Sequence, residues 1–85
     1  MKLENATVVF KSSAAWYEIE RQGYKPCTVR LMSDAEWRDL AEYDPQLIHV
    51  QRGEDEHTCF TRTVKSLYEL DKVLGQVLVI VCWRE

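Results

Sequence analysis

A lysine, a threonine and an arginine lie within six positions of one another, at Lys25, Thr28 and Arg30. Amine, hydroxyl and guanidinium groups are the donors that hold phosphates, nucleobase edges and carbonyl oxygens in proteins. Thr28 and Arg30 stand two apart in a predicted strand, so their side chains point to the same face of the sheet. Lys25 lies in the preceding turn, between Gly23 and Pro26. We therefore expect the three groups to line one side of a cleft that receives a small ligand.

Two further side chains are candidates for the rim of this cleft. Tyr24 stands beside Lys25, and an aromatic ring next to a cation can stack on a nucleobase, although packing over the helix end is an equal alternative. Arg62 belongs to a stretch without acidic residues, and the motif lies in another such stretch. If the two stretches are neighbours in space, they form a local basic face; ordinary solvated charge is the alternative. The net charge of −3 argues against a large nucleic-acid-binding surface.

Hydrophobic periodicity and turn residues predict the elements that position these side chains. The predicted strands cover residues 6–11, 27–32, 47–52, 58–65 and 77–83, and the predicted helices cover residues 14–22, 34–43 and 66–74. The order βαβαββαβ indicates one α+β domain over residues 1–85. Because the strands are short, we expect a small open β-barrel of about five strands, with three short helices.

Particular residues set these boundaries and the core. Gly23 has the position of a left-handed helix terminator, and Ser33 with Glu36 matches the capping box of the second helix. The apolar run 77–83 predicts a strand that is covered on both faces. The three tryptophans, at positions 16, 37 and 83, fit core positions.

The pattern Gly-x-Lys-x-x-Thr-x-Arg, which follows a strand and a helix, resembles the signature of the ASCH domain family. That family has a small β-barrel related to the PUA RNA-binding fold. The matching residues are Gly23, Lys25, Thr28 and Arg30, and the final strand after Gly75 is also similar. Among ASCH-like proteins, the chain is most similar to the short bacterial group that hydrolyses N4-acetylcytidine.

The resemblance implies roles for several of these residues. In that enzyme group a lysine or threonine of the motif assists attack on the acetyl amide, which gives catalytic roles to Lys25 and Thr28. The motif arginine, here Arg30, helps to set the pocket. A later glutamate completes the site, and Glu69 is the best candidate in this chain, with a solvated helix residue as the alternative reading.

Three functions remain open from the sequence. The first is an RNA- or nucleotide-binding module whose ligand-binding residues are Lys25, Thr28 and Arg30, with Tyr24 and Arg62 at the rim. The second is a small amidohydrolase that acts on N4-acetylcytidine or a related amide. The third is a protein-interaction domain that uses the acidic segment 34–56 as its contact surface.

The composition of the chain bears on its cellular compartment, on metal binding and on membrane-spanning segments. Its three cysteines are an odd number at wide spacing, which indicates buried, reduced thiols in a cytoplasmic protein. There is no C-x-x-C pair, and two histidines do not supply a metal ligand set, so we expect neither a metal nor another cofactor. The longest apolar run is far shorter than the roughly 20 residues that a membrane-spanning helix needs.

Overall fold

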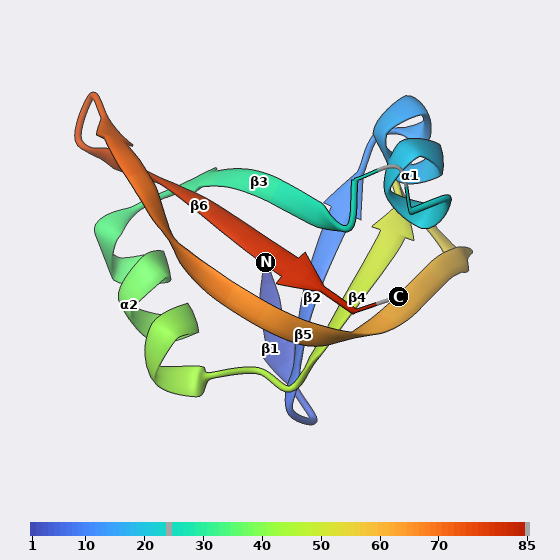
Figure 1. Ribbon diagram of the computed structural model, residues 1–85, viewed down its shortest axis with the longest axis horizontal. Helices are drawn as coiled ribbons and strands as arrows, with labels where there is room; N and C mark the ends of the chain where they lie inside the picture. Colours follow the sequence, from blue (N-terminus) through green and yellow to red (C-terminus); the bar gives the residue numbers. More distant parts are fainter. Residues whose placement is uncertain (24, 85) are drawn as a thin grey trace.

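Six strands form one mixed, open sheet in the order β1-β2-β4-β5-β6-β3 in this computed structural model, which describes residues 1–23 and 25–84 (Figure 1). The strands are β1 (Lys2–Glu4), β2 (Thr7–Ser12), β3 (Cys27–Met32), β4 (Leu47–Arg52), β5 (Asp55–Val73) and β6 (Gln76–Trp83), and the helices are α1 (Ala14–Arg21) and α2 (Asp34–Tyr43). Strands β2 and β4 are parallel, whereas the other neighbours are antiparallel. The predicted α+β class is confirmed, but the sheet does not close into a barrel.

The helix predicted over residues 66–74 is wrong, because this segment is the second half of the long strand β5. It pairs with β6 along the length of that strand. A helix here would leave the backbone donors and acceptors along one edge of the apolar strand β6 without partners. Leu74 and Gly75, with φ of 50° and 80°, form the two-residue hairpin turn. The glycine therefore ends a strand instead of a helix.

Strand β1 is a further difference from the prediction. It pairs with β2 through a tight turn at Asn5 and Ala6, where both φ angles are positive. Two consecutive residues with positive φ are typical of the turn that matches the twist of a hairpin. The sheet therefore has six strands instead of five.

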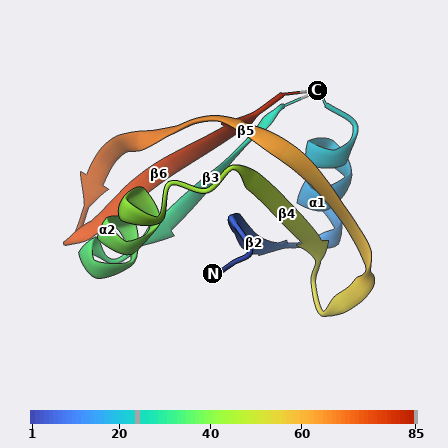
Figure 2. The ribbon, with the colours of Figure 1, turned by 90° about the horizontal axis from the view of Figure 1, so that it is seen from below.

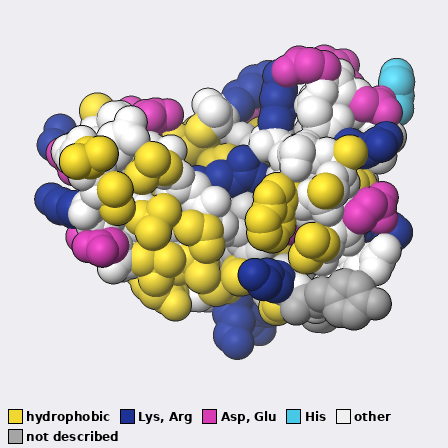
Figure 3. Space-filling model, turned by 90° about the horizontal axis from the view of Figure 1, so that it is seen from above, with side chains coloured by type: hydrophobic (Ala, Val, Ile, Leu, Met, Phe, Trp, Pro, Cys, Tyr) yellow, Lys and Arg dark blue, Asp and Glu magenta, His cyan; other side chains and the backbone are white. Residues whose placement is uncertain are grey.

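The sheet is strongly curled, and its inner side holds the hydrophobic core (Figure 2). Four alternate residues of β6 are buried there, from Val77 to Trp83, while Leu78, Ile80 and Cys82 are only half-buried. The prediction that both faces of this strand are covered is therefore wrong. Figure 3 shows hydrophobic side chains gathered over the part of the molecule that holds β3 and the β5–β6 hairpin.

The two helices lie at opposite ends of the curled sheet (Figure 1). Helix α1 buries Tyr17 and Glu20, whereas Trp16 is 55% exposed, so the core position predicted for Trp16 is wrong. The physical reason is aromatic packing, because the ring of Tyr17 lies 5.5 Å from that of Phe60 and sets the rotation of the helix. The core position of Trp83 is confirmed, and Trp37 is partly buried against the core.

The predicted helix ends are confirmed at two places. Gly23 has a φ of 79°, as a left-handed terminating residue requires. Ser33 and Glu36 form both hydrogen bonds of the capping box at the start of α2. Neither helix of the described chain is long and apolar enough to cross a membrane.

Candidate functional site

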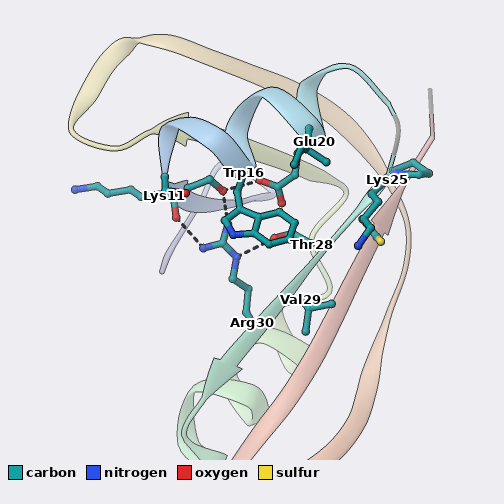
Figure 4. Close-up of a pocket in the computed structure, with 12 residues that line it drawn as sticks. Lys11, Trp16, Glu20, Lys25, Thr28, Val29 and Arg30 are labelled. Carbon is teal, nitrogen blue, oxygen red and sulfur yellow. Dashed lines mark hydrogen bonds between the residues drawn. The ribbon is translucent and has the colours of Figure 1, made fainter.

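A pocket of about 640 Å³ lies between α1 and β3, beside the turn that joins them (Figure 4). Its lining comes from the end of β2, one face of α1 and the first half of β3: Lys11, Ser12, Ser13, Trp16, Ile19, Glu20, Lys25, Pro26, Cys27, Thr28, Val29 and Arg30. Figure 4 shows Trp16 and Glu20 pointing from the helix toward β3. Two segments that flank α1 in the sequence thus meet in one concavity.

Arg30 forms the polar centre of this pocket. Its Nε donates to the Oγ1 of Thr28 over 3.0 Å, and its two terminal nitrogens donate to the Lys11 carbonyl at 2.7 Å and to the Ser12 Oγ at 2.6 Å. The guanidinium carbon also lies 4.7 Å from the centroid of the Phe10 ring. Burial lowers the pKa of Arg30, and the charge of Glu20 opposes that shift. A guanidinium remains a cation under these conditions, so the pocket contains a fixed positive charge.

Glu20 supplies a buried carboxylate next to this cation. It is only 5% exposed, and its Oε1 accepts a hydrogen bond from the Ser12 hydroxyl at 2.7 Å. Among the described residues, the only hydrogen bond to this carboxylate is the one from Ser12. Buried carboxylates are rare unless they are paired, and here the partners are a hydroxyl and the nearby guanidinium of Arg30.

An aromatic ring and an ammonium group lie at the rim. The Lys25 Nζ is 5.6 Å from the centroid of the Trp16 ring, near the outer limit of a cation–π contact. Because Trp16 is more than half exposed, the contact is weak. The site thus offers a flat apolar surface beside a mobile positive charge.

The structure brings together three of the predicted site residues and separates two others. Lys25, Thr28 and Arg30 line one pocket, and Thr28 is buried. Arg62 lies on β5, where its guanidinium carbon is 5.0 Å from the Phe60 ring centroid. Glu69 lies on the same strand and lines a different hollow beside α2, together with Lys72.

Two other predictions concern Tyr24 at the rim of the cleft and a basic face formed by two acid-free stretches. Tyr24 lies outside the described residues. The two acid-free stretches, 21–33 and 57–68, do not lie on adjacent strands, because β6 separates β3 from β5 in the sheet. The single basic face expected from them therefore does not form from adjacent strands.

Sequence reasoning missed the roles of Glu20, Ser12 and Trp16. Helical periodicity assigns Glu20 to the outer face of α1 and Trp16 to the core. In the structure Glu20 is buried and Trp16 is exposed. The only signal in the sequence is that Glu20 follows Tyr17 by three positions, which places both on one helix face. Within the part of the chain that the structure describes, no cluster of three or more His, Cys, Asp or Glu residues could hold a metal ion.

Comparison of the chain with protein-family models, with curated proteins and with solved structures finds no match.

Proposed function

We propose that this pocket binds a nucleobase, presented by a modified nucleoside or by an unpaired base of RNA, as the resemblance to ASCH and PUA-like domains implies. The observation that supports this function is an exposed indole ring, Trp16, beside the buried Glu20 and Thr28 and the partly buried Arg30. Unpaired bases are recognised by stacking on aromatic rings together with hydrogen bonds to their edges. The pocket has both elements within one concavity.

Cytosine is the base whose edge best complements these groups. A carboxylate accepts a hydrogen bond from the exocyclic amine of cytosine, and Glu20 has its Oε2 for this role. The ring nitrogen and the carbonyl of cytosine are acceptors, which suit the Thr28 hydroxyl and the remaining N–H groups of Arg30. The pocket thus offers one acceptor and two donors, which complement the one donor and two acceptors on the edge of cytosine.

The two lysines at the rim would contact the sugar or a phosphate. Lys11 forms an ion pair with Glu54 at 2.8 Å, and both side chains are exposed. Such surface pairs are weak, so a phosphate can replace the carboxylate. Because only a few phosphates are contacted, affinity for RNA should fall with added salt over a shallow slope.

Titration with cytidine, uridine and a short single-stranded RNA at low salt tests this proposal. Tryptophan fluorescence reports the occupancy of the pocket, because Trp16 lines it. We expect cytidine to bind better than uridine, and Lys25→Ala and Thr28→Val to weaken binding. Arg62→Ala is the control, since that residue lies outside the pocket lining. Absence of binding to all three ligands at low salt would contradict the proposal.

A second candidate function is hydrolysis of an N4-acyl cytidine, and a specific feature favours it. Lys25, Thr28 and a carboxylate share the pocket, but the carboxylate is Glu20 and not Glu69. In such a reaction water would break the amide bond and release cytidine and a carboxylic acid. Carboxylates and amines act as general acids and bases in reactions of this type.

Incubation with N4-acetylcytidine and measurement of released acetate tests the hydrolase. We expect Glu20→Gln to abolish turnover and Glu69→Gln to retain it. If wild-type protein binds the compound without releasing acetate, the protein binds this nucleoside but does not hydrolyse it. Full turnover by Glu20→Gln would exclude Glu20 from the reaction.

A further inference from the structure

Cys27 and Cys82 lie directly opposite each other in the antiparallel pair of β3 and β6. Cross-strand partners point to the same face of a sheet, and here both thiols are half-buried on the outer face. The composition predicts fully buried thiols, and the partial exposure of these two differs from that prediction. Burial raises the pKa of the Cys27 thiol, and the neighbouring Cys82 thiol raises it further. The register therefore makes the two side chains direct cross-strand neighbours.

The register of the sheet fixes the spacing of this pair. The backbone N–H of Trp83 donates to the carbonyl of Pro26 at 2.9 Å, which makes these two residues a hydrogen-bonded pair. Hydrogen-bonded and non-hydrogen-bonded pairs alternate along an antiparallel ladder, so Cys27 and Cys82 form the closer, non-hydrogen-bonded type. The Cα atoms of such a pair are about 4.5 Å apart, within the range that a disulfide spans. A covalent bond between the sulfurs therefore needs no change of register.

We propose that Cys27 and Cys82 form a reversible dithiol–disulfide site that is oxidised by small-molecule disulfides such as oxidised glutathione. One thiolate attacks the small disulfide, forms a mixed disulfide and releases one thiol. The second protein thiol then attacks the mixed disulfide and releases the other thiol. The two protein thiols lose two electrons and two protons, and the small disulfide becomes two thiols.

The modification would act on the candidate site through β3. This strand lies at one end of the sheet order, with β6 as its strand partner, and it carries Thr28 and Arg30. Cys27 itself lines the pocket. A disulfide to Cys82 would hold the first half of β3 against β6 and so stabilise one wall of the pocket. This inference depends on the geometry of the two cysteines and not on the ligand of the pocket.

Oxidation of the folded protein with oxidised glutathione tests the site. We expect two of the three thiols to disappear, the intact mass to fall by two hydrogens, and a peptide map to join Cys27 to Cys82. The disulfide closes a long segment of the chain, so the melting temperature should rise by about 10 °C and return after reduction with dithiothreitol.

Cys59 supplies the matched control, because it lies opposite Gln51 in another part of the sheet. Cys59→Ser should oxidise like the wild type, while Cys27→Ser and Cys82→Ser should form no internal disulfide. Peptide mapping of the wild type decides the result even if a variant does not fold. A disulfide that contains Cys59, persistent glutathione adducts without ring closure, or three unreacted thiols would each overturn the proposal.

Discussion

The Nη2 of Arg30 donates a hydrogen bond to the Oγ of Ser12 over 2.6 Å and so connects β3 to β2, which are not neighbours in the sheet. The Ser12 hydroxyl in turn donates to Glu20 on α1. Three elements are thus joined by one side-chain network beside the pocket. Because every donor of this network is directed, the network fixes the positions of the polar groups that a ligand would meet.

Arg30→Lys should lower the free energy of unfolding by about 2 kcal/mol, because an ammonium cannot reproduce the three directed hydrogen bonds of the guanidinium. Urea denaturation followed by circular dichroism measures this change. Arg38→Lys is the matched control, since Arg38 is exposed on α2 and should change stability by less than about 0.5 kcal/mol. Equal stability of the two variants would show that the Arg30 network contributes nothing to the fold.

Glu20→Gln should change the base preference of the pocket. The amide oxygen of glutamine can still accept from Ser12, but its NH₂ group replaces the acceptor that Glu20 presents. We expect the ratio of cytidine to uridine affinity to fall about tenfold, in line with the discrimination of a single base contact. Isothermal titration calorimetry measures both affinities. Glu18→Gln, on the exposed face of the same helix, should leave the ratio unchanged.

Trp16→Ala should weaken ligand binding about tenfold and leave the fold intact. Stacking of a base on an aromatic ring contributes roughly 1–3 kcal/mol, whereas an exposed side chain contributes little to the core. Trp83→Ala provides the contrast, because Trp83 is 2% exposed and its removal should cost about 3 kcal/mol or more. If Trp16→Ala unfolds the protein, the indole is part of the packing and not of a binding surface.

Leu74→Asn should stabilise the protein by about 0.5–1 kcal/mol. Leu74 is fully exposed and has a φ of 50°, a conformation that asparagine tolerates better than leucine. Asn followed by Gly75 is also the preferred pair for a two-residue hairpin turn. Thermal denaturation checks the change, with Leu70→Asn in the body of β5 as the control that should not stabilise.

Asp55 should titrate below the usual aspartate pKa of about 3.9. Its pKa is lowered mainly by the hydrogen bond that Thr58 Oγ1 donates at 2.6 Å and by the backbone N–H of His57 at 3.0 Å. A carboxyl whose pKa is lower in the folded than in the unfolded state stabilises the fold above the unfolded value. That contribution is lost as the pH falls through the folded pKa.

An NMR titration of the Asp55 carboxyl carbon measures this directly. In Thr58→Val the midpoint should move upward toward the unfolded value, because the strongest hydrogen bond is absent. A wild-type midpoint at or above about 3.9 would contradict the assignment of these hydrogen bonds.

Much of the fold follows from local signals in the sequence. The capping box at Ser33 and the terminator at Gly23 define helix ends through hydrogen bonds between near neighbours, so they can be read without tertiary information. The second half of β5 cannot be read in this way. Leu67, Leu70 and Val73 have helical spacing, but the segment lies beside the most apolar strand of the chain, and pairing with that strand overrides the spacing.

Some residues of the candidate site can likewise be predicted from the sequence, whereas others depend on long-range contacts. Alternation along a strand is enough to place Thr28 and Arg30 on one side of the sheet, and the pocket contains both. Glu20 and Trp16 could not be assigned, because the rotation of α1 depends on the contact between Tyr17 and Phe60, which are far apart in the sequence. Helical periodicity predicts Trp16 as the buried residue, because it carries no information about this long-range contact.

The pairing of β3 with β6 also determines when the pocket can assemble during synthesis. The wall that carries Thr28 leaves the ribosome early, but its partner strand, β6, emerges near the end of the described chain. Until then the nascent β3 has an open edge on both sides, which is a risk for aggregation. Translation must therefore pass beyond residue 83 before the pocket can assemble, and a nascent chain stalled earlier would contain the motif without this wall of the pocket.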